Sequence, residues 1–204
     1  MNDFIEIYDN EEKSFHVASA VTWFENNYNT TKSKEAGLSY FNQSRKRICN
    51  SMTLDFGQNY EPNETIYYLL NKAKTEYVNT YSFLKKLDWR LCPLYNIQGY
   101  DGPEEGFFSL HNEHTGMYPY RMLAWMIYLN DAASGTEFPY QNKTITPKTG
   151  RTVIWPAGWT HPHKGVIPNE GLKYIATGWF YYLPKGEPKF DGHHPDENKQ
   201  EIIV

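Results

Sequence analysis

A mainly β fold with helices at its N-terminal end is the architecture that this 204-residue sequence predicts. Aromatic residues, which favour strands and line small-molecule pockets, make up 17% of the chain. Before Trp89 the apolar residues recur at helical spacing, whereas beyond it short β-branched or aromatic runs alternate with turn signals. We therefore expect a single domain over 1–204, with a mostly helical support region at 1–89, a β core at 90–183 and an extended tail at 184–204.

Two helical segments are expected in the support region. The first has a short apolar face formed by Val17, Ala18, Ala20, Val21 and Phe24. The second runs from Asn63 to about Lys86, with apolar residues three and four apart and Asn63 as its N-cap after Pro62. An amphipathic helix of this kind needs an apolar partner, so we expect it to cover the outer face of a sheet.

The β core is expected to contain many short strands. The candidate strands are Leu94–Gly99, Gly106–Leu110, Arg121–Leu129, Thr144–Thr146, Arg151–Trp155 and Tyr174–Tyr182. Turn-forming Gly, Pro, Asn and Asp residues separate them. Short strands at even spacing indicate an antiparallel sandwich or jelly roll, with the helices packed on one of its sheets.

Charge and cysteine content argue against several classes of protein. A net charge of -4 and a single short basic cluster, Arg45 to Arg47, do not suggest a nucleic-acid partner. Two cysteines are too few for a disulfide framework, and neither lies in a zinc-binding pair. The acidic start of the sequence does not resemble a signal peptide, and no apolar run is long enough to span a membrane. We expect a soluble, cytoplasmic protein without a membrane partner.

A metal site is suggested by His111, Glu113 and a later histidine. Residues two apart on a strand point to the same face, so His111 and Glu113 can reach one ion together. Two histidines and one carboxylate on one face of a metal are typical of non-haem Fe(II) oxygenases, because the opposite face stays open. A His-x-Glu pair alone also occurs on ordinary solvent-facing strands.

The second histidine has two candidates, His161 and His163. We favour His163, in which case His161 lies beside the site or on its loop. His114 is expected to point to the other face of the strand. His193 and His194 resemble a metal-binding pair, but they fall in the tail and are discounted.

Further motifs follow in a fixed order along residues 94–183. They are Phe108 to Glu113, Arg121 to Asn130 (RMLAWMIYLN), Gly135 to Phe138, Pro147 to Arg151, His163 to Pro168, Gly171 to Tyr174, and Trp179. This order resembles the Fe(II)- and 2-oxoglutarate-dependent dioxygenases, specifically the prolyl 4-hydroxylase-like branch and its compact bacterial and phage members. The resemblance implies a double-stranded β-helix, a jelly roll of the cupin type.

The resemblance also assigns roles. It makes His111, Glu113 and His163 the iron ligands and the catalytic residues, and it places Lys173 against the distal carboxylate of 2-oxoglutarate. Tyr128 matches a tyrosine that helps to hold that carboxylate, and Thr177, on the same strand face as Lys173, is a further candidate. The implied cofactors are Fe(II) and 2-oxoglutarate as co-substrate, with ascorbate as an additional expectation.

Three departures from the family pattern are visible. The carboxylate ligand is Glu113 where Asp is commoner, and the basic residue is Lys173 where Arg would offer a bidentate fork. Ser134-Gly135 stands where two glycines are usual. Arg121 begins the strand that carries Tyr128. It could have a role in the site or form a structural salt bridge. Trp179 is expected to lie in the core.

The resemblance implies oxidation of an unactivated C–H bond with O2, with succinate and CO2 as products. A prolyl residue of a peptide or protein is the first choice of substrate, and a free amino acid or another small metabolite is the alternative. An inactive jelly-roll binding module, and a cupin-type enzyme or zinc protein that uses no 2-oxo acid, are the rival interpretations. Tyr95, Tyr100 and Trp159 are candidates for a substrate groove or for aromatic core, and the loop from Gly99 to Gly106 is a candidate lid.

Overall fold

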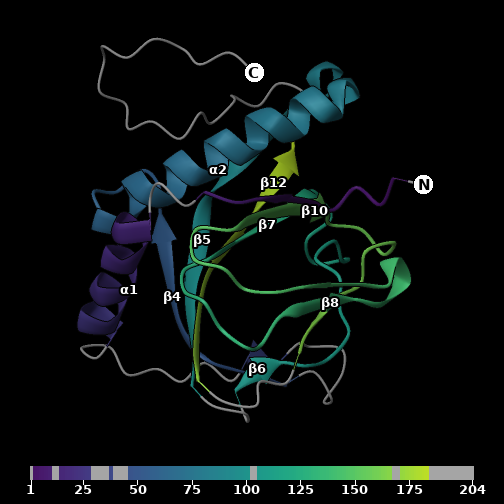
Figure 1. The fold of residues 1–204 in the computed structure, drawn as a ribbon. Helices are drawn as coiled ribbons and strands as arrows, with labels where there is room; N and C mark the ends of the chain where they lie inside the picture. The colour runs from purple at the N-terminus through teal and green to yellow at the C-terminus, as the bar shows by residue number, and fades with distance from the viewer. Residues whose placement is uncertain are drawn as a thin grey trace, which may run out of the picture.

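A six-stranded antiparallel sheet forms the centre of the fold (Figure 1). The computed structural model describes residues 2–10, 14–28, 37–38, 46–101, 105–166 and 171–183. In spatial order the strands are β1 (Glu6–Tyr8), β10 (Thr152–Pro156), β7 (Arg121–Tyr128), β12 (Leu172–Tyr182), β5 (Trp89–Asp101) and β4 (Asn50–Asp55). Neighbouring strands are distant in sequence, so the sheet brings together residues from both ends of the described chain.

Two smaller sheets accompany the large one. One contains β11 (Lys164–Gly165), β8 (Thr136–Phe138) and β9 (Lys143–Ile145). The other contains β2 (Gly37–Leu38), β3 (Lys46–Ile48) and β6 (Gly106–Phe107). A cluster that includes Met126, Phe138, Ile145, Trp155 and Ile175 is buried between β8–β9 and the large sheet.

The helices cover the opposite face of the large sheet (Figure 1). They are α1 (Ser14–Tyr28) and α2 (Glu61–Thr80), and the 3-10 turns η2 (Ser82–Lys86) and η3 (Pro139–Gln141) complete the helical elements of the described residues. Ile66, Leu69, Leu70, Ala73 and Tyr77 form the buried stripe of α2. This stripe belongs to the main apolar core with the outer-facing residues of the sheet, as the helical spacing predicts.

Strand alternation separates this core from the inner face of the sheet. On β12, Tyr174, Ala176 and Phe180 belong to the helix-side core. Lys173 and Thr177 lie one position out of phase with them and line a cavity on the other face. A mainly β architecture with helices on one sheet is thus confirmed.

The N-terminal region, expected to be mostly helical over 1–89, also contributes β1 and β4, which form the two edges of the large sheet. One expectation about this region was wrong. The helix expected from Asn63 begins at Glu61 with Tyr60 as N-cap, and it gives way to η2 after Thr80. Pro62 fits inside the first turn, where no backbone N–H is needed. The Asn63 amide instead donates to the carbonyls of Asp55 and Gln58, at 2.9 and 2.7 Å.

The expected strands differ from the structure mainly at their ends. β5 extends the predicted Leu94–Gly99 in both directions, and β6 covers only the start of Gly106–Leu110. In the β core, β8 and β11 were not predicted. The tail at 184–204 and the centre of the candidate lid, 102–104, lie outside the described residues.

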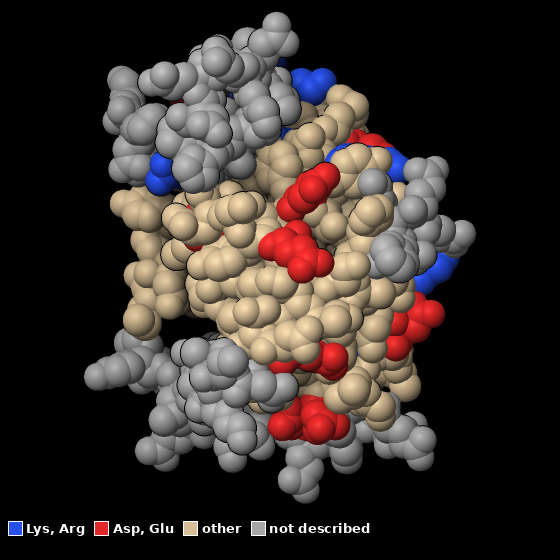
Figure 2. Space-filling model, turned by 90° about the vertical axis from the view of Figure 1, so that its left-hand side faces the viewer, with Lys and Arg blue, Asp and Glu red and all other residues tan. Residues whose placement is uncertain are grey.

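Among the described residues, no helix is long and apolar enough to cross a membrane. Acidic side chains lie in a band down the face shown in Figure 2, whereas basic ones lie at its margins. Cys49 and Cys92 are both buried and form no disulfide with each other.

Candidate functional site

The His-x-Glu motif is held in place by backbone hydrogen bonds to two later segments. His111 and His163 form an antiparallel bridge, with N–H to carbonyl distances of 3.0 and 2.8 Å. The N–H groups of Glu113 and His114 donate to the Ala157 carbonyl at 3.0 and 2.9 Å. Residues separated by about fifty positions therefore meet at one point of the jelly roll.

The side chains of His111, Glu113 and His163 converge there. The Glu113 Oε1 atom lies 3.6 Å from Nε2 of His111 and 3.5 Å from Nε2 of His163. All three potential ligand atoms lie within 4.8 Å of one another, so this set can hold a metal ion.

The ring orientations suit metal binding. Nδ1 of His111 lies 2.8 Å from the Ser109 carbonyl, and Nδ1 of His163 lies 3.1 Å from the His161 carbonyl. A carbonyl only accepts, so each Nδ1 carries a proton and each Nε2 is the ring nitrogen that faces Glu113 and can bind a metal. Burial lowers the pKa of His111, which favours the neutral imidazole that a metal requires.

Glu113 is an ionised carboxylate whose two oxygens have different surroundings. Burial alone would raise the pKa of its carboxyl, but the imidazoles of His111 and His163 hold that pKa well below its usual range. Oε1 faces the two imidazoles. Oε2 accepts hydrogen bonds from Arg121 Nη1 and Trp179 Nε1, both at 2.9 Å. One oxygen is thereby left for a metal, and the longer Glu side chain is fixed despite its extra methylene.

Arg121 and Trp179 therefore contribute to the site directly. The Arg121 guanidinium carbon lies 3.4 Å from the centre of the Trp179 ring and 3.9 Å from that of Tyr118. The two rings contact the guanidinium and keep its fork aimed at Glu113. Arg121 forms a salt bridge, as one of its two interpretations predicted, and that bridge is part of the site. The expectation that Trp179 is only core misses its hydrogen bond to Glu113.

A cavity of about 1050 Å³ opens from these residues along the inner face of the sheet. Its walls include Phe107, which stacks on His111 at 3.7 Å, and Trp155, whose ring centre lies 5.1 Å from that of His163. Tyr95 also lines it, whereas Trp159 is 75% exposed and does not.

Lys173 is buried in the same cavity. Its side chain is 7% exposed, and Nζ lies 4.9 Å from the centre of the Tyr100 ring, the residue opposite it on β5. Burial lowers the pKa of Lys173 to about 8, against a small opposing effect of Cys49. Tyr100 donates to Gln98 Oε1 at 2.7 Å. Lys173 is thus a buried basic residue in the wall of this cavity.

The other two candidate co-substrate residues are arranged differently from Lys173. Thr177 lines the cavity, but its hydroxyl donates to the Trp125 carbonyl at 2.9 Å. Tyr128 is fully buried and donates to Thr136 Oγ1 at 2.8 Å, and Thr136 is the member of this pair that lines the cavity. Tyr128 can therefore act on a ligand only through Thr136.

Of the two later histidines, His163 faces Glu113 and His161 does not. The His161 ring turns to the N-terminal segment, with Nε2 2.8 Å from the Asp3 carbonyl and Nδ1 2.9 Å from Thr160 Oγ1. His114 Nδ1 lies 3.0 Å from the Arg121 carbonyl, and His114 is not part of the converging group.

Sequence reasoning missed Gln98, Thr136 and the part played by Tyr100. Asn96, Gln98 and Tyr100 alternate along β5 and share the face that lines the cavity. Polar residues two apart in an otherwise buried strand were the available signal.

Comparison with known proteins agrees with this geometry. Residues 95–181 match the family model of the 2OG-Fe(II) oxygenase superfamily. No curated protein matched the chain.

Three solved structures share the jelly-roll fold. A viral collagen prolyl hydroxylase from Paramecium Bursaria Chlorella virus-1, in a 2OG complex, has a TM-score of 0.62 at 14% identity, over 88% of this chain and 97% of that one. A prolyl hydroxylase from Trichoplax adhaerens, in complex with a hypoxia inducible factor peptide fragment, has a TM-score of 0.60 at 18% identity, over 89% and 84%. The non-heme α-ketoglutarate-dependent epimerase SnoN of nogalamycin biosynthesis has a TM-score of 0.62 at 12% identity, over 90% and 82%. The jelly roll is thus confirmed. The sequence identities are too low to show which substrate this chain uses.

Proposed function

From the match of residues 95–181 to the model of the 2OG-Fe(II) oxygenase superfamily, we propose that this chain hydroxylates an unactivated C–H bond of a prolyl residue in a peptide or protein. The reaction would consume 2-oxoglutarate and O2 and release succinate and CO2. One observation carries the proposal: two imidazoles, one carboxylate and a buried lysine face a single cavity.

His111, Glu113 and His163 would hold Fe(II), which when bound supplies the oxidising chemistry at its open face. Arg121 and Trp179 would keep Glu113 monodentate by occupying its second oxygen. The lowered pKa values of His111 and Glu113 suit a divalent ion, because these two ligands then have few protons to release on binding.

Lys173 would bind the distal carboxylate of 2-oxoglutarate. Its ammonium is the donor of a charge-assisted hydrogen bond in a largely dry site, where such bonds are strongest. Thr136, oriented by Tyr128, would contribute its hydroxyl, and Thr177 would shape the wall with its methyl group. Ascorbate would maintain the iron in its reduced form during turnover.

The cavity favours a peptide over a small charged metabolite. Its lining includes the exposed apolar residues Leu94 and Met117, and the exposed ring of Tyr118. Arg121 and Lys164, its other lining cations, are already paired with Glu113 and Glu137. A free amino acid would therefore find few unused charges, whereas an extended neutral segment has apolar surface to cover.

Turnover assays test the proposal. Purified protein with Fe(II), ascorbate, O2 and 2-oxoglutarate should form succinate faster with proline-containing peptides than with L-proline or other free amino acids. Mass spectrometry should locate one added oxygen atom on a prolyl residue. His163→Ala should abolish succinate formation. His161→Ala is its matched control.

Stimulation by free amino acids or small metabolites alone would replace the peptide with the smaller substrate class. If the protein forms no succinate with any substrate and binds neither metal nor 2-oxoglutarate, the result would support the alternative of an inactive binding module.

A further inference from the structure

The β5 wall of the large cavity changes from exposed to buried along its length. Its lining residues alternate along the strand and are Leu94, Asn96, Gln98 and Tyr100. Leu94 is 45% exposed, whereas Gln98 and Tyr100 are only 3% and 5% exposed. Lys173, proposed above to bind 2-oxoglutarate, pairs with Tyr100. The cavity therefore has a closed end at Tyr100, where the co-substrate is placed, and an open end at Leu94, where a larger substrate can enter.

Asn96 lies between these two ends, on the side of Glu113. It pairs with Thr177 of β12, which also lines the cavity. Trp179, the next residue of β12 to line the cavity, donates to Glu113. Gln98 lies one pair further from Trp179, toward the closed end. A group bound at Asn96 is therefore closer to the three converging ligand candidates than one bound at Gln98.

The Asn96 amide is held at one end only. Thr53 lies directly opposite Asn96 on the edge strand β4 and also lines the cavity. Its hydroxyl lies 2.8 Å from Asn96 Oδ1, and the amide nitrogen has no hydrogen-bond partner among the described residues. If the amide is turned over, its nitrogen donates to the Thr53 hydroxyl and its oxygen becomes the free atom. In either orientation one polar atom bonds to Thr53 and the other is left for a ligand.

Other groups near the open end are apolar or already engaged. The Thr177 hydroxyl donates to the Trp125 carbonyl, and Arg121 is paired with Glu113. A peptide that enters past Leu94 buries some of its own main-chain N–H and C=O groups, and buried peptide groups need hydrogen-bond partners. An amide side chain can donate or accept, so it can serve either group.

We propose that Asn96 is a substrate-binding residue, which forms a hydrogen bond with a main-chain peptide group next to the target residue, and that Thr53 is the positioning residue that holds it. The inference rests on the proposed oxidation of a peptide. It also names a contact that separates the two substrate classes, because a free amino acid has no peptide group for Asn96 to bind.

Steady-state succinate formation tests the contact. The probe is the proline-containing peptide that turns over fastest in the assay above, with capped Ala-Ala-Pro-Ala-Ala as the first choice. Asn96→Ala should raise the KM for the peptide about three- to tenfold, as expected for one neutral hydrogen bond. The Kd values for 2-oxoglutarate and Mn(II) should stay unchanged. Thr53→Val should raise the same KM about two- to threefold, and Thr53→Ser, which keeps the hydroxyl, should restore the wild-type value.

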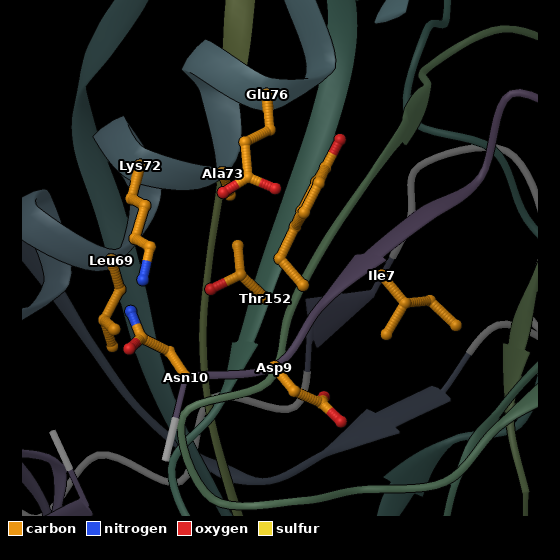
Figure 3. A pocket seen from close by; sticks show the side chains of 9 residues that line it. Ile7, Asp9, Asn10, Leu69, Lys72, Ala73, Glu76 and Thr152 are labelled. Carbon is orange, nitrogen blue, oxygen red and sulfur yellow. The ribbon is translucent and has the colours of Figure 1, made fainter. Parts of the chain in front are cut away.

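Two variants outside the large cavity are matched controls. Asn10→Ala truncates another buried asparagine, which lines a separate cavity of about 220 Å³ with Lys72 and Glu76 of α2 (Figure 3). That cavity shares no lining residue with the large one. Thr144→Val removes an exposed strand hydroxyl on β9. Both controls should leave the KM for the peptide unchanged.

Peptides with a single main-chain ester identify the group that Asn96 binds. An ester has no N–H, and its carbonyl is a weaker acceptor than that of an amide. At one position beside the proline, the ester should lower kcat/KM of the wild type about three- to tenfold, but that of Asn96→Ala less than twofold.

Three results would overturn the proposal while leaving peptide oxidation intact. They are an unchanged KM in Asn96→Ala, equal ester losses in both proteins at every position, and a 2-oxoglutarate Kd that rises as much as the peptide KM. No succinate with any peptide would instead overturn the proposed function, and this contact with it.

Discussion

Replacing Lys173 with Met should stabilise the protein while removing the cation proposed to bind 2-oxoglutarate. Burial lowers the pKa of Lys173 from its ordinary value of 10.5 to about 8, and the residue is 7% exposed. A pKa difference of about 2.5, at about 1.36 kcal/mol for each whole step, corresponds to about 3 kcal/mol of destabilisation at neutral pH. Loss of the contact between the Lys173 ammonium group and the Tyr100 ring offsets about 1 kcal/mol of this stabilisation. Met fills a similar volume, so the free energy of unfolding should rise by about 2 kcal/mol in the variant.

The pH dependence of this gain identifies its cause. Below pH 8 the lysine is protonated in both the folded and the unfolded chain, so the full cost of burying the charge is present. Between about pH 8 and 10.5 the folded chain loses the proton first. The unfolded chain then binds more protons, and the wild-type stability rises with pH. The advantage of Lys173→Met should therefore shrink over this range.

Urea unfolding followed by tryptophan fluorescence at pH 7 and pH 10 measures both effects, with Lys86→Met as the exposed-lysine control. A variant no more stable than wild type at pH 7 would refute the assigned burial cost. A difference that stays constant up to pH 10 would refute its electrostatic origin. In the same range, 2-oxoglutarate affinity of the wild type should fall as pH rises above about 8, because the free site loses its cation.

Three further predictions concern the metal-ligand candidates and their supports. Arg121→Gln should weaken Co(II) or Mn(II) binding about 10- to 100-fold by calorimetry, as expected when a hydrogen-bond partner of a ligand is lost; an unchanged Kd would mean that Trp179 alone fixes the carboxylate. His161→Ala should bind metal like wild type while His163→Ala does not, and the reverse result would exchange their roles. Tyr128→Phe should raise the Kd for 2-oxoglutarate up to about tenfold by removing one buried hydrogen bond, and leave the metal Kd unchanged; equal loss of both would indicate a general structural effect.

Local patterns predicted most strands of the β core and the shared face of His111 and Glu113, because their signals lie within a few residues. After Arg121 the residues of β7 form an unbroken apolar run, and the strand has almost the predicted length. His111 and Glu113 share a face, as their spacing of two requires.

Features that depend on contacts distant in sequence were not predictable. β1 has only three residues, and its pairing with β10 joins positions almost 150 residues apart. The Trp179 indole reaches Glu113 across 66 positions, so nothing near Trp179 in sequence distinguishes it from a core aromatic. The Asn63 side chain donates to the Asp55 and Gln58 carbonyls and does not cap the helix. The helix therefore begins before the residue that was expected to be its N-cap.

The visible absorption of the protein with Fe(II) and 2-oxoglutarate, without O2, tests the central claim most directly. A metal-to-ligand charge-transfer band should appear when both are added to the wild type or to His161→Ala. It should be absent in His163→Ala and much weaker in Lys173→Met. No band in folded, iron-loaded wild-type protein would contradict the assignment of His111, Glu113, His163 and Lys173, and would leave a jelly roll that binds without catalysis.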